Sequence, residues 1–164
     1  MNDSTFGWPP QVATGSGMPR IETDIDIACP PVRVFEYVTT PALWPTWHPA
    51  TAAVREAPNR PLCTGETMIE EIRAVGRRFE ARWTVLACES PGLWVIATAT
   101  ANGDARIVYR IAPARDGCRF QRTLEYRSHH WPWRALDANV THWLLGWQSR
   151  RALTNLKRVL EGAT

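Results

Sequence analysis

The sequence predicts an α+β fold in which a curved antiparallel sheet of about seven strands wraps around one long C-terminal helix. The segment 132–162 can form that helix, since Pro132 suits a first helical turn and Gly162 suits a helix end. The segment 50–127 contains successive strands joined by hairpin-length turns, which favours antiparallel pairing. The apolar face of such a sheet needs a cover, and the predicted helix is the one element large enough to provide it.

The composition is typical of a soluble globular chain. Of the 164 residues, 45% are hydrophobic and 21% are charged, which suits one domain with a substantial core. We expect a flexible leader over residues 1–19 and a single domain over residues 20–164. No apolar run reaches membrane-spanning length and no secretion signal is present, so we expect a cytoplasmic protein. The net charge of +3 is small and the basic residues are spread along the chain, which gives no indication of nucleic acid binding.

The four cysteines do not form a recognisable metal or redox motif. They contain no C-x-x-C pair, and the four histidines do not fall at zinc-site spacings. Two disulfides are conceivable, but the spacing favours isolated buried thiols in a reducing compartment. No glycine-rich phosphate loop is present either. We therefore expect no metal and no cofactor.

The first third of the chain predicts one strand and two short helices. Residues 20–28 alternate between apolar and acidic side chains, as in a half-buried strand. Pro31 begins a short helix that reaches residue 38, because a proline in the first turn loses no hydrogen bond. A second short helix or turn covers residues 42–47 and ends before Pro49.

The middle of the chain predicts six further strands. Turn sequences separate them, including Ser90-Pro91-Gly92 and Asp116-Gly117, which is a hairpin signal. The predicted strands cover residues 51–56, 66–74, 77–88, 93–100, 105–112 and 118–127.

The long helix carries an uneven apolar stripe. Residues at helical spacing place large aliphatic side chains toward its C-terminus and small or polar ones toward its N-terminus. The stripe contains Ala135, Ala138, His142, Leu145, Ser149, Ala152, Leu153, Leu156, Val159 and Leu160. We therefore expect the C-terminal half to be anchored on the sheet while the N-terminal half covers an open space.

Two segments and a hairpin resemble the START-like superfamily of helix-grip proteins, and within it the polyketide cyclase/dehydrase and lipid-transport group. The segments are Ile25 to Val38 and Pro41 to Pro49, and the hairpin is Asp116-Gly117-Cys118. Members often carry Thr after that glycine, so Cys118 departs from the pattern. The ending Leu156 to Glu161 is also similar, and the resemblance spans residues 20–162. The resemblance implies a cavity between sheet and helix. The superfamily includes cyclases, dehydratases, lipid carriers and chaperone activators.

The resemblance and the alternation of the strands together give a predicted cavity lining. A mostly apolar pocket suits a small hydrophobic ligand, such as a lipid, a polyketide or an aromatic metabolite. The predicted lining residues are Trp47, Met68, Phe79, Trp83, Tyr109, Phe120, Tyr126, Ala138, His142 and Leu145.

Two polar residues on apolar faces are the best catalytic candidates. His142 suits a general acid or base for enolisation or dehydration, but we favour a histidine satisfied by a backbone carbonyl or by Tyr126. Arg122 breaks the apolar face of its strand. Either it binds a carboxylate or phenolate of a ligand, or it pairs with Glu70 or Glu80 at the cavity rim. Both interpretations stay open.

Three further residues have less definite roles. Glu70 and Glu71 are adjacent, so they point to opposite sides of a strand and one is inward or at an edge. An inward carboxyl would have a raised pKa and could act as an acid, although a sheet edge beside an arginine is the favoured interpretation. His48 follows Trp47 at the cavity mouth, where a portal residue is favoured over a catalyst.

A second apolar face exists in the first half of the helix and predicts an interface patch. It contains Leu136, Val140, Trp143, Leu144 and Trp147, followed by Arg150 and Arg151. A homodimer face or a cover provided by the leader ranks above contact with an anionic membrane. The opposite orientation, with the tryptophans filling the cavity, also stays open.

Three functions follow, in order of preference. The first is a protein that binds one small hydrophobic molecule. The second is an aromatase/cyclase or dehydratase that places His142, Arg122 and a tyrosine around a carbonyl. The third is an interaction module that uses the tryptophan face.

Overall fold

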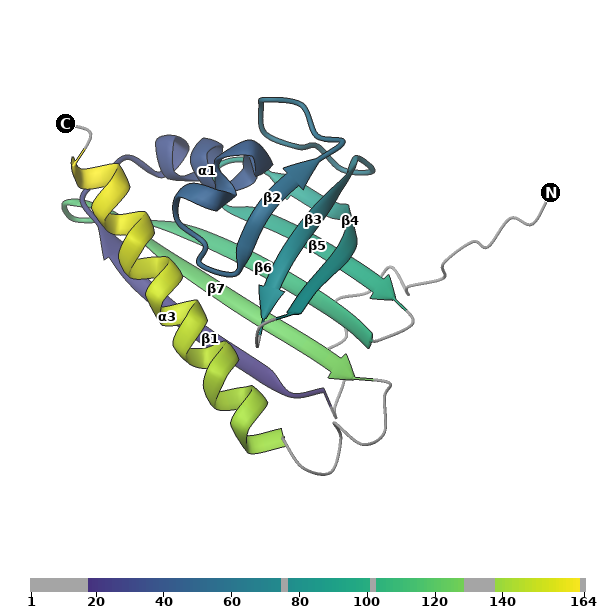
Figure 1. Cartoon of the computed structure of the whole chain (residues 1–164). Coiled ribbons are helices and arrows are strands. Elements are labelled where there is room, and N and C mark those ends of the chain that lie inside the picture. Colours follow the sequence, from purple (N-terminus) through teal and green to yellow (C-terminus); the bar gives the residue numbers. More distant parts are fainter. Residues whose placement is uncertain (1–17, 75–76, 101–102, 129–137, 163–164) are drawn as a thin grey trace.

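The computed structural model describes residues 18–74, 77–100, 103–128 and 138–162 (Figure 1). For a few residues beside the gaps, only the backbone is described. Its seven strands form one antiparallel sheet in the order β1-β7-β6-β5-β4-β3-β2. In chain order the elements are β1 (Arg20–Ile27), α1 (Pro31–Thr39), the 3-10 helix η1 (Pro41–Thr46), β2 (Thr51–Arg55), β3 (Thr67–Ala74), β4 (Arg77–Glu89), β5 (Leu93–Thr100), β6 (Gly103–Ala114), β7 (Gly117–Ser128) and α3 (Ala138–Gly162).

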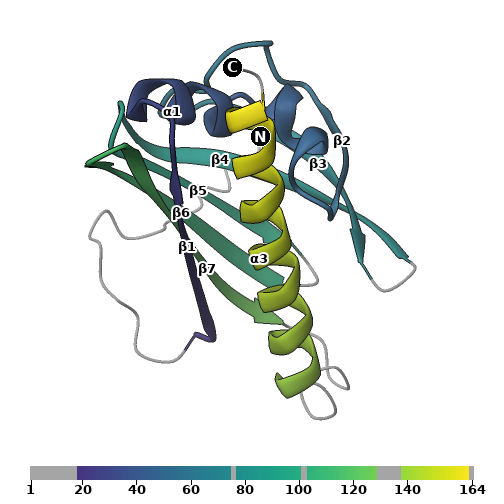
Figure 2. The ribbon, with the colours of Figure 1, turned by 90° about the vertical axis from the view of Figure 1, so that its left-hand side faces the viewer.

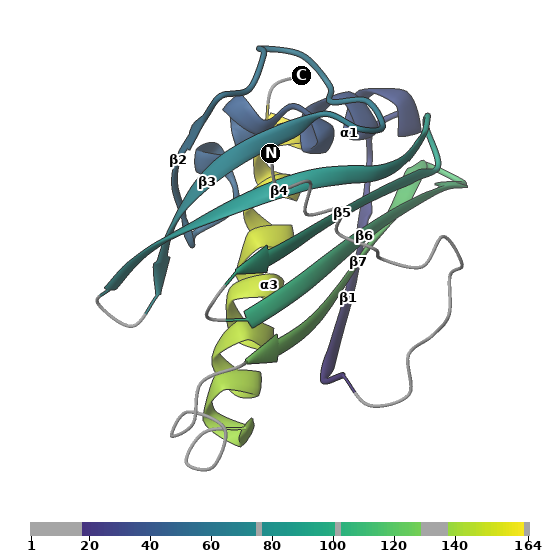
Figure 3. The same ribbon diagram turned by 90° about the vertical axis from the view of Figure 1, so that its right-hand side faces the viewer.

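The sheet curls and α3 crosses its inner side, which confirms the predicted fold class. Figures 1 and 2 show α3 running beside β1, with α1 and η1 closing the end near its C-terminus. Figure 3 shows the curvature from the opposite side, with β2, β3 and β4 bending over the helix. Predicted strand and short-helix boundaries agree with the structure to within two residues. The predicted leader and the predicted start of the long helix at Pro132 lie outside the described residues.

Helix α3 is fixed at its C-terminal half, as the apolar stripe predicts. Ala152, Leu153, Leu156 and Leu160 of the stripe are buried in the core. Three polar contacts add to this burial. The Lys157 ammonium donates to the Asp26 carbonyl at 2.6 Å, the Ala28 N–H donates to the Glu161 carboxylate at 2.8 Å, and the Asn155 amide donates to the Trp47 carbonyl at 3.2 Å. Among the described residues, none of the helices combines the length and hydropathy needed to cross a bilayer.

Aromatic rings fill the core beneath the short helices. Trp94 and Tyr109 are cross-strand partners, and their rings stack with centroids 5.5 Å apart. Phe120 meets Tyr109 edge-on at 5.2 Å, and Trp44 of η1 meets Trp94 edge-on at 6.2 Å. Such stacked and edge-on pairs stabilise a core beyond the area they bury. These contacts connect β5, β6, β7 and η1 and give the cavity a rigid base.

The four cysteines are all free, as their spacing predicts. Cys29 and Cys118 are buried, and burial together with the nearby Cys29 raises the pKa of Cys118 to about 11. Cys63 is exposed and Cys88 is half-buried, so the prediction of buried thiols is wrong for these two residues.

Gly117 allows the β6–β7 hairpin to approach the end of β1. Its φ of +145° lies where residues with a side chain are strained, and an added Cβ would lie 2.1 Å from the Ile27 carbonyl oxygen. The same Cβ would lie 2.7 Å from the Cys29 nitrogen. Since both neighbours are backbone atoms, neither can move aside without shifting the strand.

We expect Gly117→Ala to lower the free energy of unfolding by about 2 kcal/mol or more, because the strand end must move to admit a methyl group. Urea unfolding followed by circular dichroism measures the change. Gly146→Ala is the matched control. Its Cβ would make only an ordinary contact at 3.5 Å with the Arg150 side chain, so we expect unchanged or slightly raised stability. Equal stability of the two variants would contradict the close approach.

Candidate functional site

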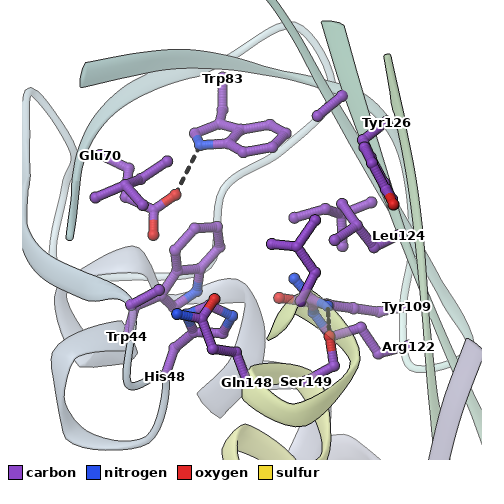
Figure 4. Close-up of a pocket in the computed structure, with 15 residues that line it drawn as sticks. Trp44, His48, Glu70, Trp83, Tyr109, Arg122, Leu124, Tyr126, Gln148 and Ser149 are labelled. Atoms are coloured by element: carbon purple, nitrogen blue, oxygen red, sulfur yellow. Dashed lines mark hydrogen bonds between the residues drawn. The ribbon is translucent and has the colours of Figure 1, made fainter. Parts of the chain in front are cut away.

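A cavity of about 180 Å³ lies between the inner side of the sheet, η1 and α3 (Figure 4). Its walls are mostly apolar and aromatic, with a few polar groups. The lining residues are Trp44, His48, Ala50, Glu70, Ile72, Trp83, Ala105, Ile107, Tyr109, Arg122, Leu124, Tyr126, Leu145, Gln148 and Ser149.

The pairing register of the strands explains why these side chains converge. On β6 and β7 three directly opposed pairs form one wall: Ala105 with Tyr126, Ile107 with Leu124, and Tyr109 with Arg122. Alternate residues of a strand share a face, so all six project to the same side. Glu70 on β3 and Trp83 on β4 form the facing wall in Figure 4. On α3, Leu145 lies one helical turn before Gln148 and Ser149, so the three side chains share one side of the helix. They close the cavity from the helix.

Arg122 is buried between the sheet and the helix, with 3% of its surface exposed. Its guanidinium donates to the Ser149 hydroxyl at 2.8 Å and lies close enough to Tyr109 to oppose the rise in the pKa of that hydroxyl. Its Nε is buried without a partner. Among the described residues no carboxylate forms an ion pair with it, since Glu80 pairs with Arg55 instead. The predicted pairing with Glu70 or Glu80 is therefore wrong.

Glu70 is the inward carboxyl of the Glu70-Glu71 pair, with 4% of its surface exposed. The Thr51 hydroxyl donates to one oxygen at 2.5 Å, and the Trp83 indole N–H donates to the other at 2.9 Å. Burial raises the pKa of the Glu70 carboxyl, while these two hydrogen bonds and the charge of Arg122 oppose the rise. The raised pKa favours the neutral acid, which the surrounding donors still orient.

His48 and Tyr109 are both held in their neutral forms. Burial, together with the positive charge of Arg122, lowers the pKa of His48 to about 3. Its Nδ1 lies 3.3 Å from the Thr51 hydroxyl, which connects it to Glu70. Burial raises the pKa of Tyr109 to about 12, so its hydroxyl keeps its proton at neutral pH. Arg122 is thus the positively charged group among the residues that line the cavity.

Several predicted lining residues are brought together by the fold. Trp83, Tyr109, Tyr126 and Leu145 line the cavity, and so does the catalytic candidate Arg122. Their role in binding a ligand stays a prediction.

Six predicted lining residues, including His142, lie elsewhere or cannot be placed. Trp47, Met68 and Phe120 are fully buried in the core instead of lining the cavity. Phe79 is 41% exposed, because β4 pairs with β5 only from Thr84 onward and the β3–β4 hairpin projects beyond the sheet (Figure 3). Ala138 begins α3, but its side chain is not among those described.

His142 is an exposed residue outside the cavity lining, so the cavity prediction is wrong for it. Its Nδ1 lies 3.4 Å from the Tyr126 hydroxyl, in agreement with the favoured interpretation of a histidine satisfied by that tyrosine.

The predictions missed the inward direction of His48 and several residues of the lining, which are Trp44, Ala50, Ile72, Ala105, Ile107, Leu124 and Gln148. Trp44 and His48 come from the short helical segment, where no strand alternation indicates which side faces inward. The Trp44 indole N–H donates to the Val38 carbonyl at 2.8 Å, and this contact fixes the ring at the cavity edge. Ser149 was part of the predicted stripe, and its small size leaves the space that Arg122 occupies.

The tryptophan face of α3 points outward. Trp143 is 64% exposed and Trp147 is 40% exposed, so the opposite orientation is wrong for these two residues. The Arg151 guanidinium lies 5.2 Å from the Trp147 ring centroid, within cation–π range. Leu144 is half-buried, Leu136 lies outside the described residues, and the side chain of Val140 is not described. The use of this patch as an interface stays a prediction.

The curled sheet, the long helix and the cavity between them define a START-like, helix-grip protein. The chain belongs to the polyketide cyclase/dehydrase and lipid transport family, whose model matches residues 18–161. Comparison with curated proteins finds no match.

Solved structures of low sequence identity share the fold. A START superfamily protein from Mycobacterium smegmatis is 12% identical with a TM-score of 0.73, and the match covers 88% of this chain and 99% of that one. A protein from Rhodobacter sphaeroides is 19% identical with a TM-score of 0.69, covering 94% and 99%. A protein from Mesorhizobium loti is 13% identical with a TM-score of 0.67, covering 89% and 99%.

The lowered pKa of His48 gives a pH prediction. Between pH 6.5 and about 3 the unfolded chain takes up a proton at His48 that the folded chain does not, so stability falls as the pH falls. We expect the free energy of unfolding of His48→Gln to fall by about 2–4 kcal/mol less than that of the wild-type chain over this pH range, because the variant has no imidazole to protonate. Urea unfolding at a series of pH values measures it.

The ring signals of His48 in NMR spectra provide a direct check. We expect them to keep the chemical shifts of a neutral imidazole from about pH 8 to pH 5, where an unperturbed histidine would titrate. A titration midpoint near 6.5 would contradict the buried environment. The His48→Gln spectrum assigns the signals.

Proposed function

We propose that this protein binds one small, mainly apolar molecule in the cavity between the sheet and α3. The observation that carries the proposal is the cavity itself, which has aromatic walls from Trp44, Trp83 and Tyr126 and a few oriented polar groups. Ligand sites have this composition, with apolar walls for affinity and polar groups for orientation. The family description, which includes lipid transport, supports the same conclusion.

A second candidate function is an enzymatic elimination or cyclisation in the same cavity. The observation that favours it is the presence of a fixed cation with Tyr109 on one wall and of Glu70 and His48 near the other (Figure 4). Arg122 and Tyr109 would hydrogen-bond a carbonyl oxygen and stabilise its enolate. Neutral His48 would accept the proton from the adjacent carbon, and protonated Glu70 would give a proton to the departing hydroxyl, which leaves as water.

Filling the cavity tests the first function. We expect Leu145→Trp to abolish ligand binding while the chain stays folded, because Leu145 is half-buried and its enlarged side chain would occupy the cavity. Native mass spectrometry of freshly purified protein measures the bound mass. Val32→Trp is the control, since Val32 is 50% exposed on α1. Equal ligand occupancy in both variants would remove the cavity from the function.

The enzymatic alternative predicts a separation of rate from affinity. With a β-hydroxy ketone as probe, we expect Glu70→Gln to reduce the rate of water loss by at least about 100-fold, because the amide cannot supply the proton. Enone absorbance measures the rate, and the dissociation constant should change little. His142→Ala is the control, with an unchanged rate expected. A wild-type chain that binds the probe without converting it would leave binding as the function.

A further inference from the structure

We propose that the ligand is a single-ring aromatic carboxylate whose carboxylate pairs with Arg122. This inference rests on the proposed function and specifies the ligand class of the same cavity. It follows from three features: the unpaired charge of Arg122, the donors around it, and the size and walls of the cavity.

The charge of Arg122 has no counter-ion among the described residues. A guanidinium keeps its positive charge in proteins, and a buried charge without a partner destabilises the folded state strongly. Glu70 is the one carboxyl that lines the cavity, and its two oxygens accept from Thr51 and Trp83 on the facing wall. The remaining lining groups near Arg122 are neutral. An anionic ligand in the cavity would therefore supply the counter-ion that Arg122 lacks among the described residues.

The hydrogen bonds around Arg122 favour a carboxylate over other anions. Ser149 accepts from the guanidinium and holds it between helix and sheet, while the guanidinium Nε is buried without a partner. A fixed guanidinium binds a planar carboxylate through two parallel N–H···O bonds, and that geometry favours carboxylates. The Tyr109 hydroxyl keeps its proton and can donate it to the same carboxylate. A small inorganic anion would satisfy the charge but leave the apolar walls without a partner.

The cavity size limits the rest of the ligand to about one ring. An apolar protein cavity of about 150 Å³ is known to hold benzene, and the cavity here measures about 180 Å³. Pockets for drug-sized ligands are larger, at about 300–1,000 Å³. The rings of Trp83, Trp44 and Tyr126 offer faces and edges against which an aromatic ring packs favourably. A long acyl chain does not fit this volume, whereas a benzoate-sized molecule does.

Paired probes test the inference. Benzoate and benzyl alcohol have the same ring and nearly the same size, but only benzoate carries a charge, while acetate carries the charge without the ring. Binding is measured by isothermal titration calorimetry at neutral pH and constant salt. For the wild-type chain we expect benzoate to bind at least 10-fold more tightly than benzyl alcohol and acetate to bind no more tightly than benzyl alcohol.

Arginine variants locate the interaction. Arg122→Gln should abolish the preference for benzoate while the affinity for benzyl alcohol stays within about threefold. Arg119→Gln is the matched control, because Arg119 lies on the same strand but is exposed and pairs with Asp24. It should keep the wild-type preference. A preference for benzoate that persists in Arg122→Gln would overturn the inference. If that variant does not fold, the wild-type comparison of benzoate with benzyl alcohol decides alone.

The outcomes separate this inference from the proposed function. If benzyl alcohol binds as tightly as benzoate, the cavity is still a site for an apolar ligand, but the inference that the ligand carries a carboxylate is overturned. Failure of both ring probes to bind the wild-type chain, with no molecule bound after purification, would overturn the proposed function and this inference together. Acetate binding as tightly as benzoate would show that the ring contributes nothing and would overturn the aromatic part.

Discussion

The one-sided anchoring of α3 is the constraint on which the rest of the structure depends. Its C-terminal turns place Leu153, Leu156 and Leu160 in the core, and hydrogen bonds tie the same turns to β1 and to the segment after η1. The turns before Ser149 therefore extend over the sheet without filling the space beneath them. A helix with large aliphatic residues along its whole length would close that space. The cavity is a consequence of where the large side chains stop.

The polar groups of the cavity are distributed so that charge is concentrated on one side. Arg122 is shared by the sheet and the helix, whereas Glu70 and His48 are connected through Thr51 near the other wall. Burial favours the neutral form of both Glu70 and His48, and the charge of Arg122 adds to the effect on His48 but opposes it on Glu70. A molecule held between the two walls would experience a strong field along one direction. This asymmetry supports both binding of an oriented ligand and proton transfer across it.

Sequence reasoning predicted the fold well because the fold is specified by periodicity. Strand alternation, the Asp116-Gly117 turn and the apolar stripe of the helix each determine local geometry, and the structure agrees with all three. The same reasoning predicted Trp83, Tyr109 and Tyr126 in the lining from strand alternation, and Leu145 from the apolar stripe of the helix.

The misses have physical causes that a single sequence does not reveal. Periodicity gives the face on which a residue lies but not its distance along the element from the cavity. Phe79 is on the correct face and past the last β4–β5 pairing, while Met68 and Phe120 are fully buried in the core. His142 lies on the predicted stripe, one turn before the part of α3 that lines the cavity. Glu70 accepts from Thr51 of β2 and Trp83 of β4, and Arg122 donates to Ser149 of α3, so their partners depend on how separate elements pack together.

The division of the cavity between sheet and helix affects how such a protein can change over time. One wall consists of opposed residues on β6 and β7, whose replacement would disturb neighbouring pairs, whereas Leu145 and Gln148 project from a single helix that meets no partner strand there. Substitutions on the helix can thus alter volume and polarity while the sheet keeps its register. The helix side of the cavity can therefore diverge in sequence while the strand pairing of the fold is kept.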